Sequence, residues 1–257
     1  MTISYLFTLL SGLLSGGALG LTGGGGSILA VPLLVYLVGE DIHLAIGTSL
    51  VAVGVTSLIS SVSYMRQSLV KFKIAFFMAA PGLISTYVGA LINRQVKGPV
   101  LLLIFALLMI YIGYLMSSRK AVERKETTNL SAVNYPRILT LGFITGLASG
   151  FFGIGGGFLL VPALFLGANL KMKEAIATSL FIIFLFGMFG LASYLIQGRE
   201  INLVISTIFV AGGSIGGVTG AYYAKRLNQV LLRRLFSIFI ILIGLAVFAE
   251  NLIVIFN

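Results

Sequence analysis

The chain contains two copies of one glycine-rich stretch, about 130 residues apart. The first copy, GGALGLTGGGGSILAVP, covers residues 16–32, and the second, GLASGFFGIGGGFLLVP, covers residues 146–162. The register continues beyond each stretch without a gap, so that Thr48-Ser49 falls on Thr178-Ser179. A fixed repeat of this length indicates that the chain arose by duplication of one structural unit. Any fold proposed for the chain must therefore place two equivalent units, each with its own glycine cluster.

The composition indicates that both units lie in a membrane. Hydrophobic residues make up 58% of the chain and charged residues only 9%, with a mean hydropathy of +1.10, whereas a soluble domain carries about 25% charged residues. We therefore predict an all-α polytopic membrane protein. Each half has five apolar segments, at roughly 3–21, 27–38, 44–64, 74–92 and 99–117, then 137–152, 157–168, 175–197, 201–224 and 235–254.

The apolar segments divide the chain into two transmembrane repeats, residues 1–117 and 137–257. The polar residues 118–136 between them are expected to form a cytoplasmic linker. A membrane-spanning helix needs about 20 apolar residues, and the second segment of each half is too short for this. We therefore expect a broken or half-length helix at each glycine-rich motif.

The basic residues predict how the segments cross the membrane, because Lys and Arg concentrate in cytoplasmic loops. If each half crosses an odd number of times, one side holds most of the 17 basic residues and the other keeps only Arg94, Lys97 and Arg199. An even number of crossings removes this bias. The two halves are thus expected to be inverted, in a bacterial inner membrane, with both termini on the outer side. Charge leaves open whether the first two segments of each half both cross or form a re-entrant hairpin.

The two glycine clusters are the candidate substrate site. Inverted repeats with interrupted helices are typical of secondary transporters, whose substrate lies where the broken helices meet. The start of a helix offers free N–H groups to an anion, and the equivalent Thr-Ser pairs could donate hydrogen bonds. The candidate substrate-binding residues are Gly23, Gly24, Gly25, Gly26, Ser27, Thr48, Ser49, Gly153, Gly155, Gly156, Gly157, Thr178 and Ser179.

A purely structural role is the alternative for several of these features. Glycines can serve close helix packing, which is the favoured interpretation for Gly12, Gly16, Gly142 and Gly146. The Thr-Ser hydroxyls can bond within their own helices. Tyr64 and Tyr194, at the ends of equivalent segments, fit aromatic anchoring at the membrane surface.

The inventory of ionisable residues limits the chemistry. The seven acids lie in loops or near segment ends, no Lys or Arg falls in the middle of a segment, and the chain has one His and no Cys. This favours a small anionic or polar substrate and argues against an enzyme, a metal site or any cofactor. The net charge of +10 is explained by membrane topology, so no nucleic-acid partner is expected.

The motifs GLTGGGGSILAVP and GFFGIGGGFLLVP resemble those of the TauE/SafE sulfite exporter family, also called the toluene sulfonate uptake permease family. The resemblance covers the whole chain, including A-x-x-T-S-L after each motif. It implies a permease for sulfite, an organosulfonate or a related anion. The duplicated glycine break and the core without charge lead us to expect alternating access, with the substrate held between the two breaks. An anion channel, or a transporter of sulfate, a carboxylate or another polar solute, is the alternative. The partners expected are the small anion and the lipid bilayer, with a homodimer possible.

Overall fold

The computed structural model describes residues 2–93, 96, 98–117, 134–152, 157–196, 198 and 200–256, and these residues contain helices and no strand. The prediction of an all-α fold is therefore confirmed. The predicted linker lies outside the described residues, apart from residues 134–136. The helices are α1 (Thr2–Thr22), α2 (Gly25–Leu33), α3 (Ile42–Met65), α4 (Phe72–Asn93), α5 (Gly98–Ser117), α6 (Tyr135–Phe152), α7 (Gly157–Pro162), α8 (Met172–Ile196), α9 (Leu203–Arg226) and α10 (Gln229–Phe256).

The short helices α2 and α7 are the half-length elements that the sequence predicts. Each runs into a wider π-helical turn, at Leu34–Val38 after α2 and at Ala163–Gly167 after α7. Pro32 and Pro162 lie just before these turns. Proline has no N–H to donate, and its ring crowds the preceding helical turn. The two prolines therefore account for the local widening of the helix at these places.

Helix α2 folds back along α1, so the first two segments form a helical hairpin. The Ser15 hydroxyl of α1 donates to the Gly26 carbonyl of α2 over 2.7 Å. A Cβ atom added at Gly26 would overlap the Ser15 carbonyl and the Leu19 side chain. The second segment therefore returns beside the first.

Glycine faces hold the longer helices together in parallel pairs. Gly12, Gly16 and Gly20 of α1 lie directly on the backbone of α9, and added Cβ atoms there would overlap it. Gly142 and Gly146 of α6 meet the backbone of α4 in the same way. Packing by small residues is therefore confirmed for these positions, as expected for helices that associate in lipid.

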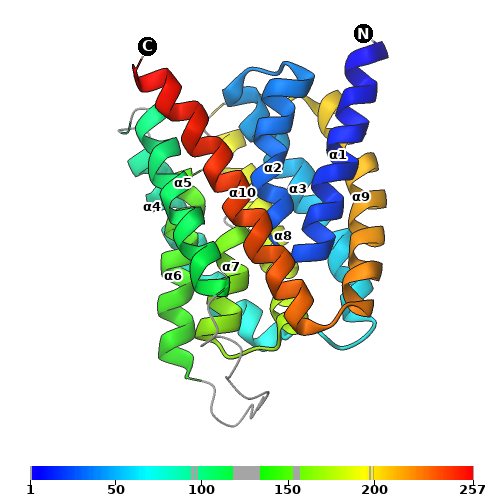
Figure 1. Cartoon of the computed structure of the whole chain (residues 1–257), viewed down its shortest axis with the longest axis vertical. Helices are drawn as coiled ribbons and strands as arrows, with labels where there is room; N and C mark the ends of the chain where they lie inside the picture. The colour runs from blue at the N-terminus through cyan, green and yellow to red at the C-terminus, as the bar shows by residue number, and fades with distance from the viewer. Residues whose placement is uncertain are drawn as a thin grey trace.

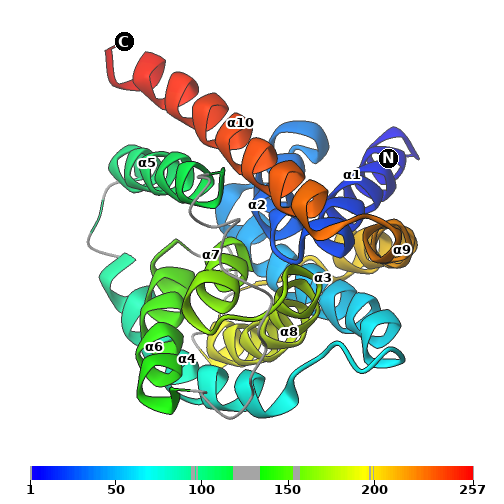
Figure 2. The same cartoon turned by 60° about the horizontal axis from the view of Figure 1, so that its bottom comes forward.

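The same contacts recur at equivalent positions of the two halves. Gly16 meets Gly213 and Gly146 meets Gly82, so that each pair joins one half of the chain to the other. A third pair, α5 with α10, also joins the two halves but runs antiparallel, since Gly113 packs on the Ile241 side chain and Gly244 packs on the Ile110 side chain. Figure 2 shows the three pairs arranged around α2, α3, α7 and α8. The halves therefore form one core, while their inverted relation to the membrane stays a prediction.

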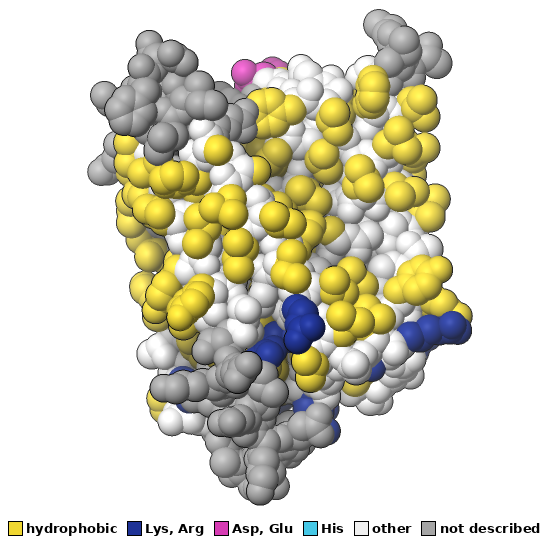
Figure 3. Space-filling model, in the orientation of Figure 1, with side chains coloured by type: hydrophobic (Ala, Val, Ile, Leu, Met, Phe, Trp, Pro, Cys, Tyr) yellow, Lys and Arg dark blue, Asp and Glu magenta, His cyan; other side chains and the backbone are white. Residues whose placement is uncertain are grey.

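The helices run between two ends of different charge. In Figure 1 both termini lie at the upper end, and α1, α3 and α9 lead downward from it. Figure 3 shows Lys and Arg side chains gathered toward the lower end of this face and Asp or Glu at the upper end. We call these the basic end, which includes Lys71, Lys173 and Lys225, and the acidic end, which includes Glu40 and Glu200.

The surface between the two ends is suited to lipid. Six helices of the described chain are long and apolar enough to cross a membrane, and large apolar side chains such as Ile84, Ile215 and Leu242 are exposed on them. The chain is therefore a multi-pass membrane protein.

Replacing Gly16 by Ala is expected to lower the free energy of unfolding by about 1–3 kcal/mol, because overpacking forces backbones apart. Gly17→Ala is the matched control, since its added Cβ would find only the Gly216 carbonyl oxygen, at 3.8 Å. The midpoint of thermal unfolding in detergent measures both. Equal midpoints for the two variants would contradict the packing role of Gly16.

Candidate functional site

The loop Gly23–Gly24 separates α1 from α2 inside the protein. The Gly23 N–H closes α1 by donating to the Leu19 carbonyl over 2.7 Å, and Gly23 itself has a φ of +77°. This left-handed conformation ends many helices and strongly favours glycine there. Every residue from Gly23 to Ile28 is buried, so the interruption is shielded from lipid.

The first turn of α2 presents backbone donors to this interior. A helix leaves its first N–H groups without acceptors within the helix, here those of Gly25, Gly26 and Ser27. The Thr22 hydroxyl oxygen accepts the hydrogen bond of the Gly25 N–H over 2.9 Å. The Ser27 hydroxyl donates back to the Gly24 carbonyl over 2.7 Å. No described residue accepts a hydrogen bond from the N–H group of Gly26 or Ser27, and N–H groups at the start of a helix are suited to an anion.

The start of α7 meets the start of α2 at this place. A Cβ atom added at Gly24 would overlap the carbonyl oxygen of Gly157. A Cβ atom added at Gly157 would lie 2.9 Å from the Ser27 hydroxyl and 3.1 Å from the Gly24 Cα. Because Ser27 and Gly157 are equivalent positions of the repeat, the two short helices touch through corresponding residues. The predicted site residues Gly153, Gly155 and Gly156 lie outside the described residues.

Helix α8 supports the glycine loop through Ser179. Its hydroxyl contacts the Gly23 carbonyl at 2.7 Å and the carbonyl of Ile176, one turn earlier, at 2.8 Å. Ser179 is seven residues from the start of α8 at Met172, which is about 10 Å along the helix axis. The loop therefore lies well inside the bundle, on the side of its midpoint nearer the basic end.

The other predicted hydroxyls have different partners. Thr178 accepts a hydrogen bond from the Lys71 N–H over 3.1 Å, and Ser49 donates to the Ile46 carbonyl of its own helix over 2.8 Å. Thr48 donates to the Glu40 carboxylate over 3.3 Å. The structure thus brings Gly23–Ser27, Gly157 and Ser179 together, while Thr48, Ser49 and Thr178 bond elsewhere.

Tyr64 is a site neighbour whose role sequence reasoning missed. Its ring is fully buried, and its hydroxyl donates to the Gly20 carbonyl, one turn before the glycine loop, over 2.7 Å. The expectation of anchoring at the membrane surface is therefore wrong for Tyr64, and Tyr194 is buried too. Tyr64 and Tyr194 occupy equivalent positions of the repeat, and this equivalence indicated a common structural role.

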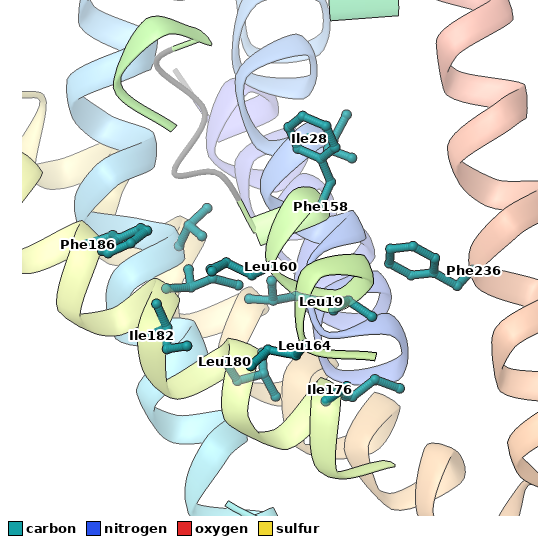
Figure 4. Packing of buried hydrophobic residues seen from close by; sticks show 14 of the residues in the cluster. Leu19, Ile28, Phe158, Leu160, Leu164, Ile176, Leu180, Ile182, Phe186 and Phe236 are labelled. Carbon is teal, nitrogen blue, oxygen red and sulfur yellow. The ribbon is translucent and has the colours of Figure 1, made fainter. Parts of the chain in front are cut away.

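The loop and its hydroxyl contacts are packed among apolar side chains. Figure 4 shows part of the core on which it rests, with Ile28 of α2, Phe158 of α7 and Phe236 of α10. No group of three or more His, Asp or Glu side chains that could hold a metal ion occurs among the described residues. The site can therefore offer backbone N–H groups in a buried setting, where such donors are strengthened, while the neighbouring hydroxyls of Ser15, Ser27 and Ser179 donate to carbonyl groups.

Comparison with known proteins identifies relatives along nearly the whole chain. The family model described as Sulfite exporter TauE/SafE matches residues 8–247. A probable membrane transporter protein of Xylella fastidiosa strain Temecula1 is 39% identical over 254 residues, 96% of each chain. The probable membrane transporter protein YunE of Bacillus subtilis is 30% identical over 272 residues, covering 97% of this chain and 99% of that protein.

Replacing Ser179 by Ala is expected to loosen the glycine loop, because the Gly23 carbonyl loses a donor worth about 1 kcal/mol. Hydrogen–deuterium exchange of peptides covering residues 19–28 should become faster. Ser61→Ala is the control, since the Ser61 hydroxyl donates only to the Leu58 carbonyl of its own helix, over 2.7 Å. Unchanged exchange at residues 19–28 in Ser179→Ala would show that this contact does not hold the loop.

Proposed function

The chain belongs to the TauE/SafE sulfite exporter family, and on this premise we propose that it is a permease for a small anion, sulfite or an organosulfonate. Family membership and the names of the relatives make it a membrane transporter. The choice of an anion rests on the chemistry of the glycine site, and the choice of mechanism rests on the contacts at the basic end. We place the protein in the bacterial inner membrane with the basic end inside, as the positive-inside rule requires.

One observation carries the choice of an anion: the first turn of α2 starts inside the protein, against α7. Its N–H groups of Gly26 and Ser27 and the positive end of the helix dipole favour a negative ligand. Glycine at 24 and 157 lets the two short helices approach closely, so that the start of α2 is held against the start of α7. A cation site would instead need carboxylates or several free carbonyl groups, and here Ser179, Ser27 and Ser15 occupy the carbonyls of Gly23, Gly24 and Gly26.

Alternating access is supported by the ties at the basic end. The Lys71 ammonium forms an ion pair with Glu174 at 2.9 Å, joining the turn before α4 to α8. The Lys225 ammonium donates to the Ser63 carbonyl over 3.2 Å, and the Lys173 ammonium donates to the Lys225 carbonyl over 2.6 Å. The first two of these contacts join the first half of the chain to the second. We infer that they close the basic end while the substrate is bound or exchanged on the other side.

The proposed substrate class is tested by isothermal titration calorimetry of the purified protein with sulfite, sulfoacetate, sulfate and acetate. We expect sulfite or sulfoacetate to bind, and Gly24→Ala to abolish that binding by pushing the two short helices apart. Gly17→Ala is the control for the substitution itself. Binding of cations with no binding of any of the four anions would overturn the assignment. Flux through proteoliposomes that does not saturate with concentration would show a channel instead.

The closing role of the Lys71–Glu174 pair is tested by thiol labelling. The chain has no cysteine, so a single Ile176→Cys places one buried thiol beside Gly23. A partly exposed ion pair is worth up to about 1 kcal/mol, or about a fivefold change in the open population. Lys71→Ala should therefore speed labelling from the basic end by about that factor, using a thiol reagent that does not cross membranes.

Two controls accompany this measurement. Gln67→Cys, exposed at the basic end, should label rapidly with or without the ion pair. The exchanged pair Lys71→Glu with Glu174→Lys should restore slow labelling at residue 176. An equal labelling rate in the presence and absence of the pair would refute its closing role.

A further inference from the structure

The acidic end contains a half-buried carboxylate that the site described above does not use. Glu40 follows the π-helical turn after α2, and its N–H donates to the Leu34 carbonyl over 3.0 Å. Gly39, with a φ of +79°, makes the turn that allows this bond. The backbone therefore fixes Glu40 in place, so that its side chain points back toward α3 and α9.

The two carboxylate oxygens of Glu40 have unequal surroundings. Oε1 accepts a hydrogen bond from the Thr48 hydroxyl of α3 over 3.3 Å. The side chain of Asn202, the residue that caps the start of α9, lies near enough to the carboxylate to lower its pKa. Oε2 is buried, and no described residue supplies it with a hydrogen-bond donor. A buried acceptor without a donor is costly when it carries charge, and taking up a proton lowers that cost by removing the charge.

Among the described residues, Glu174 at the basic end has a lysine partner, whereas Glu40 at the acidic end has no basic partner. Thr178 is the repeat equivalent of Thr48, and it too lies near a carboxylate, Glu174. There Lys71 neutralises the acid at 2.9 Å while its own N–H bonds to Thr178. At the acidic end the described residues contain no lysine or arginine that pairs with Glu40. Burial accordingly raises the pKa of the Glu40 carboxyl, and the side chains of Thr48 and Asn202 only partly oppose the rise.

We propose that Glu40 is a proton-binding site that couples anion movement to the pH gradient across the membrane. The proposal rests on the permease function proposed above. The ionised carboxylate accepts from Thr48 in the first half of the chain, and Asn202 of the second half lies near it. Protonation gives the vacant oxygen a hydrogen to donate and removes the charge that holds both side chains. Proton binding therefore alters the joint between the two halves at the acidic end, opposite the Lys71–Glu174 tie.

Several other groups near Glu40 can also titrate or carry charge. Asp41 is its neighbour in the chain, Glu200 comes shortly before Asn202, and Tyr194 of α8 packs on Gly47 of α3. The side chain of His43 and the basic residues Arg94, Lys97 and Arg199 lie outside the described residues. His43 is the group whose ordinary pKa falls nearest to neutral pH, so its variant is the necessary control.

The first measurement follows proton binding without any substrate. A raised pKa means that the folded protein binds the proton more tightly than the unfolded chain. The melting midpoint of the wild-type protein should therefore fall as the pH rises through the pKa of Glu40. Glu40→Gln should lack this fall, while His43→Gln and Glu40→Asp should keep it. The same pH profile in wild-type and Glu40→Gln protein would overturn the assignment of the site.

The second measurement follows coupling, with sulfoacetate in proteoliposomes at neutral pH, where both its acid groups are ionised. With the membrane potential held at zero, a gradient of one pH unit supports about a tenfold accumulation of a solute that moves with one proton. The wild-type protein should approach this ratio, and Glu40→Gln should only equilibrate sulfoacetate across the membrane. Equal accumulation by both proteins would overturn the coupling. If no anion is bound or moved, the permease proposal fails, and the melting profile still decides whether Glu40 binds a proton.

Discussion

The need to satisfy every backbone hydrogen bond inside a membrane governs this structure. A helix interrupted at Gly23–Gly24 would be unstable against lipid, where an unpaired peptide group costs several kcal/mol. The protein tolerates the interruption because the loop is buried and its carbonyl groups are matched by hydroxyls. Ser179 bonds to the Gly23 carbonyl, Ser27 to that of Gly24, and Ser15 to that of Gly26. The N–H groups of Gly26 and Ser27 at the start of α2 have no acceptor among the described residues, and these groups define the candidate site.

The same constraint makes the two halves of the chain depend on each other. The glycine faces of α1 and α6 are covered by α9 and α4, and each of these pairs joins one half to the other. In lipid no hydrophobic effect drives helices together, so such close backbone contact supplies much of the attraction. The two short helices consequently meet at one place, Gly24 against Gly157. A single half would leave both its glycine face and its interrupted helix uncovered.

Charged side chains at the two ends join one helix or turn to another. The basic end is tied by Lys71 to Glu174 and by Lys225 to the Ser63 carbonyl. The acidic end joins its parts through Glu40, whose second carboxylate oxygen has no donor among the described residues. The two ends thus differ although the halves of the chain are repeats. Thr48 and Thr178 occupy equivalent positions, but Thr48 bonds to the Glu40 carboxylate and Thr178 bonds to the Lys71 N–H. A difference of this kind is what a transporter needs if the two sides of the membrane are to be opened under different conditions.

The sequence by itself determined the features that depend on local composition and order along the chain. Apolar length located the helices, the repeat located the two glycine interruptions, and the short second segments predicted α2 and α7. The spacing of Gly12 and Gly16 predicted close helix packing. These signals are local, because helix length, glycine conformation and hydropathy are properties of neighbouring residues.

Only the tertiary structure decided which surfaces meet. It showed that α2 returns beside α1, that Ser179 rather than Ser49 bonds to Gly23, and that Tyr64 is buried against Gly20. It also placed Asn202 of the second half on Glu40 of the first. These contacts join residues far apart in the chain, and their geometry follows from the packing of whole helices. A residue's own type and neighbours do not contain that information, and so the tyrosine looked like a surface anchor and Glu40 like an ordinary loop acid.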